Sequence, residues 1–268
     1  MKNHIRAEPL ASFLLFTGVA PAACALVISS AVAGTQCASE AIVTDRPDVT
    51  NSSIVVPTGA FQSENGIDLV TRGSAKVLDG TESRLRLGIA SCLELLLDLP
   101  SYFVALHGTA PTGFSNLVPA IKWQLGPLPG DVELSVTAGA GLPTGSTRLA
   151  GKGPQPYLQL PWSRELGGGW GVSGMLTAFF FPSSSVSTVT TEATLAIERE
   201  LGARSDVFVE YVGDFPSHSM PSDSLNLGAA YRLTPRQQID FHLAVGLNRA
   251  APSYIIGIGY SFRFDDLF

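Results

Sequence analysis

The chain has 268 residues, of which 15 % are charged and 45 % are hydrophobic, and its formal net charge is −6. An acidic chain does not suit nucleic acid as a partner, and the charged fraction lies below the roughly 25 % of soluble domains. Past the N-terminus no run of about 18 apolar residues occurs, so no membrane-spanning helix is expected there. Low charge without such a helix favours a membrane barrel, which distributes its apolar residues along alternating strands.

Residues 1–33 have the features of an export signal. Lys2 and Arg6 precede an apolar stretch from Leu10 to Ile28, and Ala31-Val32-Ala33 is a small-x-small cleavage site. We therefore expect residues 1–33 to be a signal peptide that is cleaved off, which implies that the mature protein leaves the cytoplasm.

Residues 34–58 form a polar, turn-rich segment ahead of the first expected strand. At its centre, Asp45-Arg46-Pro47-Asp48 combines charges with a proline that argues against regular structure. We expect this segment to be periplasmic or to lie in a barrel lumen, where Asp45, Arg46, Pro47 and Asp48 form a plug or else a solvated leader. Export also brings Cys37 and Cys92 into an oxidising compartment, where a disulfide and two free thiols are both compatible with the sequence.

Residues 59–268 predict an all-β domain, a closed antiparallel transmembrane β-barrel of about 12 strands. In the last strand apolar residues such as Ile256 and Ile258 alternate with Gly257 and Gly259, so that one face is apolar and the other is small or polar. In chain order the expected strands are 61–72, 83–90, 93–99, 116–125, 132–142, two that flank the glycines 167–169 and contain Leu158 to Trp162 and Trp170 to Phe180, then 188–200, 206–215, 224–232, 238–248 and 254–264.

The connections between these strands predict the orientation. Those after the even-numbered strands are short, whereas most of those after the odd-numbered strands are longer and polar, among them residues 73–82 and 101–113. Outer-membrane barrels have short periplasmic turns and longer outer loops. A soluble β-sandwich or lipocalin-like barrel shows the same alternation of residues, but it usually exposes more charge than this chain has.

Strand parity also assigns charged residues to the inner face of the barrel. We expect a narrow pore whose charged wall selects solutes, or else a salt-bridged polar core that only fills space. The residues expected to line the lumen are Asp68, Arg84, Arg86, Glu94, Asp98, Lys122, Glu133, Glu192, Glu210, Arg232, Asp240 and Arg263.

Several segments resemble a known family of outer-membrane, transporter-like proteins that is associated with the meta-cleavage pathway of phenol degradation. The segments that carry the resemblance are Thr44-Asp45-Arg46-Pro47-Asp48-Val49-Thr50, the stretch 56–66, Arg84-Leu85-Arg86-Leu87-Gly88-Ile89, Leu93-Glu94-Leu95, Leu142-Pro143-Thr144-Gly145 and the last strand. The resemblance implies an outer-membrane location and a transport role.

The function expected from the sequence is passive passage or binding of small solutes, aromatic or otherwise hydrophobic, by a porin-like channel in the outer membrane of a Gram-negative bacterium. The alternatives are a structural or surface-binding barrel with a plugged lumen and an outer-membrane hydrolase. We expect no enzyme, because His218 and Ser219 are adjacent without forming a recognisable catalytic pair and no Gly-x-Ser-x-Gly motif occurs. No cofactor or metal is expected; the expected partners are outer-membrane lipid, the barrel-assembly machinery and an unknown small-molecule solute.

Overall fold

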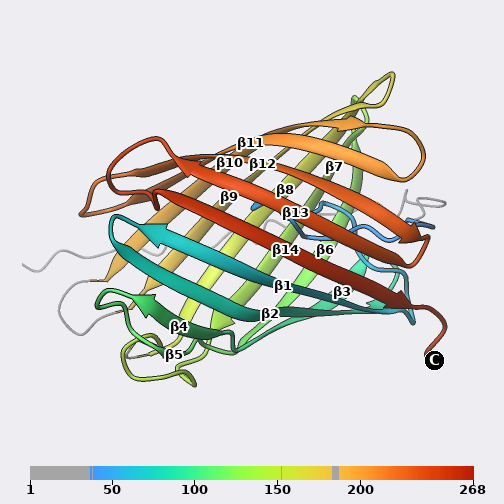
Figure 1. The fold of residues 1–268 in the computed structure, drawn as a ribbon. Helices are drawn as coiled ribbons and strands as arrows, with labels where there is room; N and C mark the ends of the chain where they lie inside the picture. Colours follow the sequence, from blue (N-terminus) through green and yellow to red (C-terminus); the bar gives the residue numbers. More distant parts are fainter. Residues whose placement is uncertain (1–36, 38, 152, 183–186) are drawn as a thin grey trace, which may run out of the picture. The chain divides into compact units, whose positions relative to one another are not determined.

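A computed structural model describes residues 37, 39–151, 153–182 and 187–268, so the expected signal peptide, residues 1–33, lies outside the described residues. The described residues form one antiparallel sheet that closes on itself, because β1 pairs with β14 on one side and with β2 on the other (Figure 1). Within this part of the chain no helix is long and apolar enough to cross a bilayer.

The sheet contains fourteen strand segments. They are β1 (Phe61–Arg72), β2 (Ala75–Ala90), β3 (Leu93–Leu99), β4 (Tyr102–His107), β5 (Gly113–Phe114), β6 (Val118–Leu128), β7 (Val132–Gly141), β8 (Gln155–Gly167), β9 (Trp170–Phe181), β10 (Thr188–Glu200), β11 (Ser205–Pro216), β12 (Ser222–Thr234), β13 (Gln237–Gly246) and β14 (Tyr254–Phe264).

These fourteen segments occupy twelve strand positions. One half of β2 pairs with β3 and the other half pairs with β4, so β3 and β4 are two parts of one strand position that is interrupted at Pro100 and Ser101. In the same way β6 pairs with β3 while β5 pairs with β4. The predicted closed antiparallel barrel of about 12 strands is therefore confirmed.

Two of the expected loops are wrong. Residues 73–82 were expected to be a loop, but β2 begins at Ala75 and its first residues pair with the end of β1. A register shift next to Thr81, whose φ is 68°, changes which residues face inward, and this hides the alternation on which the sequence argument rests. About half of the expected loop 101–113 is likewise strand, since it contains β4 and the first residue of β5.

The barrel is apolar outside and polar inside. Outward side chains such as Ile197 and Ile258 are 51 % and 59 % exposed, whereas the largest fully buried side chains include Arg86, Lys122 and Glu210. A soluble protein buries its apolar side chains and leaves its charges in water. This inversion is what a strand sheet needs if lipid covers its outer face.

The two rims of the barrel differ in their connections. One rim, called the short-turn rim below, carries the turns 91–92, 129–131, 168–169, 201–204 and 235–236. Gly167, Gly168 and Gly169 all have positive φ, which L side chains adopt only with strain, so this tight turn needs glycine. The opposite rim, called the long-loop rim, carries connections such as 142–154 and 247–253.

Candidate functional site

The candidate site is built around residues 39–58, called the strap below, which run inside the barrel and belong with it to one compact unit. Both ends of the strap are fixed near the turn between β2 and β3. Just before the strap, Cys37 forms a disulfide with Cys92 in that turn. At the other end, Thr58 forms a parallel bridge with Gly88. Gly88 has to be glycine, because a Cβ there would lie 2.0 Å from the carbonyl oxygen of Pro57.

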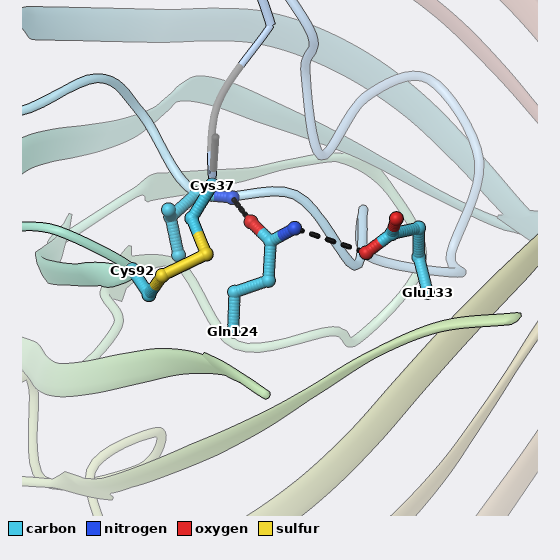
Figure 2. Close-up of a disulfide and its surroundings, with 5 residues drawn as sticks. Cys37, Cys92, Gln124 and Glu133 are labelled. Atoms are coloured by element: carbon cyan, nitrogen blue, oxygen red, sulfur yellow. Dashed lines mark hydrogen bonds between the residues drawn. A yellow bond between two sulfur atoms is a disulfide. The ribbon is translucent and has the colours of Figure 1, made fainter. Parts of the chain in front are cut away.

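Figure 2 shows how the disulfide joins the strap to the wall. Gln124 on β6 accepts a hydrogen bond of 3.1 Å from the Val55 amide of the strap and donates one of 3.0 Å to Glu133. The disulfide between Cys37 and Cys92 lies beside this chain of contacts. Covalent and hydrogen-bonded attachments therefore hold the strap at neighbouring points of the same wall.

Asp45 attaches the strap to a basic wall formed by β2 and β6. Its carboxylate lies 3.0 Å from Arg84 Nη1, 3.2 Å from Arg86 Nη1 and 3.1 Å from Lys122 Nζ. The same carboxylate accepts a 2.9 Å hydrogen bond from the Ser52 amide, which stabilises the bend of the strap. Burial by itself would raise the pKa of Asp45, but the attraction of Arg86, Lys122 and Arg84 outweighs it and lowers the pKa.

Arg86 connects this wall to two carboxylates on neighbouring strands. Its guanidinium lies 3.0 Å from Glu64 Oε1 and 2.9 Å from Glu94 Oε1, and it also donates a 2.9 Å hydrogen bond to the Ile54 carbonyl of the strap. Glu94 in turn accepts a 2.7 Å hydrogen bond from the Val56 amide. The strap backbone thus completes the hydrogen bonding of a charged cluster that is fully buried, as such clusters require.

Arg46 points away from that wall into an acidic niche. Its guanidinium lies 2.6 Å from Glu82 and 3.6 Å from Asp240, with Asp68 at 4.0 Å. These carboxylates raise the pKa of Arg46 although burial alone would lower it, so the side chain stays charged.

A pair of glycines makes room for the Arg46 guanidinium. Gly66 on β1 and Gly259 on β14 are direct neighbours across the strand pair that closes the barrel. A Cβ on Gly66 would lie 2.2 Å from Arg46 Cζ, and one on Gly259 would lie 2.7 Å from Arg46 Nε. The small residues on the inner face of the last strand, such as Gly259, therefore leave space for the charged side chains of the lumen.

The tip of the strap reaches β11. Glu210 accepts hydrogen bonds from the amides of Val49 (2.9 Å) and Thr50 (2.7 Å) and from the Thr50 hydroxyl (2.7 Å). Asp48, beside these residues, has its pKa raised well above the ordinary value by burial and by the nearby charges of Glu210 and Glu198. The strap is therefore held to β11 by neutral donors and to β2 and β6 by ion pairs.

Two cavities lie on either side of the strap. The outer chamber, about 670 Å³, reaches toward the long-loop rim and is lined by residues such as Ser101 and Asn116. The inner chamber, about 370 Å³, reaches toward the short-turn rim and is lined by residues such as Gly169 and Arg232. The residues that line both chambers are Arg46, Pro47, Asp48 and Asn51. A single layer of the strap therefore separates the two chambers.

The twelve charged residues expected on the inner face differ in their relation to the strap. Those within hydrogen-bond or ion-pair distance of strap atoms are Asp68, Arg84, Arg86, Glu94, Lys122, Glu210, Asp240 and Arg263. Asp98 and Glu133 act through another side chain, namely Arg84 and Gln124. Arg232 lines the inner chamber, and Glu192 makes no ion pair or hydrogen bond to the strap among the described residues.

Sequence reasoning missed several residues that hold the strap. Glu64 accepts a 2.8 Å hydrogen bond from the Asp45 amide, and it shares the inner face of β1 with Asp68, so parity would have found it. Gln62 and Gln238 donate to strap oxygens, but uncharged polar residues carry no signal in a search restricted to charges. His242 on β13 also faces the lumen, where it lies 3.2 Å from Asp68.

No group of three or more His, Cys, Asp or Glu side chains among the described residues is arranged to hold a metal ion. His218 and Ser219 lie exposed in the turn after β11, and neither side chain donates a hydrogen bond to the other in the part of the chain that is described.

Comparison with known proteins identifies the family and the fold. The model of the family described as "Putative MetA-pathway of phenol degradation" matches residues 44–264, from the strap to the last strand. The chain is similar to the COG4313 outer membrane channel from Pseudomonas putida F1, with a TM-score of 0.62 and 17 % identity over 82 % of this chain and 99 % of that one.

The NanC porin is similar as well, with a TM-score of 0.54 and 7 % identity over 75 % of this chain and 98 % of that one. At these identities the likeness shows the fold alone, which is that of an outer-membrane barrel. No curated protein matches the chain in sequence.

Proposed function

The chain belongs to the family described as "Putative MetA-pathway of phenol degradation", and from that membership we propose that it is a passage for small solutes across the outer membrane of a Gram-negative bacterium. Lipid covers the apolar outer face, the barrel-assembly machinery inserts the chain, and the short-turn rim faces the periplasm, with the strap in the lumen. We assign no reaction to the barrel. Solutes cross it by passive diffusion down their concentration gradient.

The observation that carries this proposal is the pair of chambers separated by a thin strap. A barrel that only fills its lumen has no need of a cavity of about 670 Å³ on one side of the strap and another of about 370 Å³ on the other. Because Arg46, Pro47, Asp48 and Asn51 line both chambers, a displacement of this short stretch joins them into one path. Asp68, Arg84 and Asp98 of the outer chamber and Arg232 of the inner chamber then line that path. The segment Asp45 to Asp48 acts as its gate.

The outer chamber suits small solutes with an apolar part. Besides its polar residues it is lined by Leu99, Phe103, Val118 and Leu149. Pockets that combine apolar walls with a few polar groups are typical of sites for small organic molecules. A volume of about 670 Å³ holds a single-ring aromatic compound with room for water.

The second candidate function is a structural or surface-binding barrel that the strap keeps closed. It is favoured by the fully buried ion pairs of Arg86 and by the many strands that the strap contacts. The two candidates predict opposite behaviour in a bilayer, because a permanently closed barrel carries no current.

The test is conductance of the purified, refolded protein in a planar bilayer, together with liposome swelling in neutral aromatic solutes and sugars. A variant that lacks residues 40–54 serves as the open reference, and the heat-dependent shift in electrophoretic mobility of folded barrels checks that it is folded. We expect discrete channel events from the intact protein and larger, ungated events from the deletion variant. Silence of both folded proteins at all voltages would refute the passage, and silence of the intact protein alone would favour the closed barrel.

A further inference from the structure

Both chambers carry an excess of negative charge. In the outer chamber the charged lining residues are the carboxylates Asp45, Asp48, Glu64, Asp68, Glu82 and Asp98 and the guanidiniums Arg46 and Arg84. In the inner chamber they are Asp48, Glu165, Glu198, Glu200 and Asp206 against Arg46 and Arg232. The same sign on both sides of the strap means that a solute meets one kind of field along the whole path.

The excess persists when the cations behind the chamber walls are included. Arg86 and Lys122 do not line a chamber, and they compensate Asp45, Glu64 and Glu94, with which they form ion pairs. Asp68, Glu82, Asp98 and Asp240 have only Arg46 and Arg84 as cationic Arg or Lys partners among the described residues. The pairs therefore leave carboxylates in excess even if Asp48 is counted as neutral.

Asp240 gives an independent sign of uncompensated charge. Its side chain is fully buried, and neither of its carboxylate oxygens has a hydrogen-bond partner among the described residues. The nearest cation is Arg46, at 3.6 Å, which already lies 2.6 Å from Glu82. Asp240 lines neither chamber, so this carboxylate adds to the negative field behind the wall and is not itself a contact for a solute.

The inner mouth is the other acidic region. Glu198 and Glu200 on β10 lie beside Glu165 on β8 in the lining of the inner chamber, and Glu198 has one hydroxyl partner, Ser173. Arg164 and Arg199 alternate with these residues along the two strands and so belong to the opposite face. The cation nearest in sequence therefore does not neutralise the mouth.

We propose that the passage prefers cations, and that its organic solutes are neutral or ammonium-bearing compounds with a small apolar body rather than carboxylates. This inference rests on the proposed function and names its solute class. The ammonium group would lie near Asp68, Glu82 and Asp98, while the apolar body contacts Phe103 and Leu149 on the same chamber wall. Rings of Asp and Glu select cations in other pores by the same summed field.

The expected size of the effect follows from Coulomb's law. A unit charge about 8 Å from a carboxylate in water has an interaction energy close to RT, and salt reduces it further. Two or three uncompensated carboxylates therefore predict that potassium permeates about three- to tenfold more readily than chloride at low ionic strength.

The experiment measures reversal potentials of the intact protein in a planar bilayer, first in a potassium chloride gradient and then with benzylammonium chloride or potassium benzoate on one side. Liposome swelling with benzyl alcohol supplies the neutral compound of the same shape. We expect potassium to exceed chloride and benzylammonium to exceed benzoate. Channel events with a preference for chloride and benzoate, or with none, would overturn this inference alone, whereas complete silence would overturn the proposed function.

A charge variant tests the cause of the preference. Glu165→Gln combined with Glu198→Gln and Glu200→Gln removes three charges from the inner mouth, and we expect the potassium preference to fall at least twofold. None of the three side chains forms a hydrogen bond or ion pair with the strap among the described residues. Asp131→Asn with Asp266→Asn is the matched control, because both residues are exposed, line neither chamber, and have positive φ values that asparagine tolerates. If the triple variant does not fold, Glu200→Gln alone replaces it. An unchanged preference in the folded mouth variant would overturn the assignment to these carboxylates.

Discussion

Replacing Asp45 by alanine is the sharpest test of how the strap is held. The side chain is 1 % exposed and lies within 3.2 Å of three cations, Arg84, Arg86 and Lys122. Asp45→Ala removes the anion that these cations share and also the acceptor of the Ser52 amide. The loss acts on the docked strap only, because in a displaced strap Asp45 is solvated.

The expected free-energy cost of Asp45→Ala follows from the burial of its ion pairs with Arg84, Arg86 and Lys122. Removal of one partner from a buried, hydrogen-bonded ion pair costs about 3–5 kcal/mol. At 1.4 kcal/mol for each factor of ten, a loss of about 3 kcal/mol raises the ratio of displaced to docked strap about 100-fold. We therefore expect a channel that is mostly closed in the wild type to be open for a large part of the time in Asp45→Ala.

The assay is the open probability of single channels, with limited proteolysis of the strap as a second readout. Asp45→Asn is the informative companion, because it keeps the shape and an acceptor for the Ser52 amide and removes the charge alone. Asp131→Asn, in an exposed turn, is the control for a lost charge elsewhere. If the open probability and protease resistance of folded Asp45→Ala both equal those of the wild type, the ion pairs do not hold the strap and the reasoning is refuted.

Three further predictions concern pH, backbone clearance and the disulfide. The pKa of Asp48 is raised in the docked strap, so its neutral form stabilises docking fully below a pH of about 4. This stabilisation is lost as the pH rises through the raised pKa, and the open probability of the channel should increase over the same pH range. Asp48→Asn should abolish the increase. Gly66→Ala puts a methyl carbon 2.2 Å from the guanidinium carbon of Arg46, so the conductance should differ from that of the wild type. Gly153→Ala, whose added carbon has no neighbour within 4 Å and which lines neither chamber, should match the wild type. The disulfide between Cys37 and Cys92 closes a loop with a separation of 55 residues, worth about 4 kcal/mol in the chain-entropy model, so its reduction should speed proteolysis of the strap; equal cleavage rates would contradict this.

The sequence was sufficient for the barrel because alternation of side chains is a local property. Each strand reports its own inner and outer face, and this placed Arg86, Lys122 and Glu210 on one face without knowledge of their partners. The same reasoning failed where a bulge at Thr81 inverted the alternation, which is why the first part of β2 was taken for a loop.

The pairing across the lumen could not be predicted from local patterns. Arg46 lies between Glu82 on β2 and Asp240 on β13 because closure of the barrel pairs β14 with β1, although Arg46 and Asp240 are 194 positions apart. The gate role of Asp45 to Asp48 stays a prediction that the conductance experiments test. The two chambers depend on the path of the strap through the lumen. The sequence shows that the strap is polar and rich in turns, but it does not show this path.

The way in which the strap is attached also has a consequence for the order of assembly. The residues that bind the strap are distributed from Glu64 on β1 to Arg263 on β14. A sheet in which only some of the strands have paired therefore lacks part of the surface on which the strap docks. The strap is synthesised before all the strands, but it can dock completely only after β14, the last strand, has paired. Docking of the strap is therefore coupled to the pairing of β1 with β14. Substitutions that weaken either step should slow insertion of the whole chain.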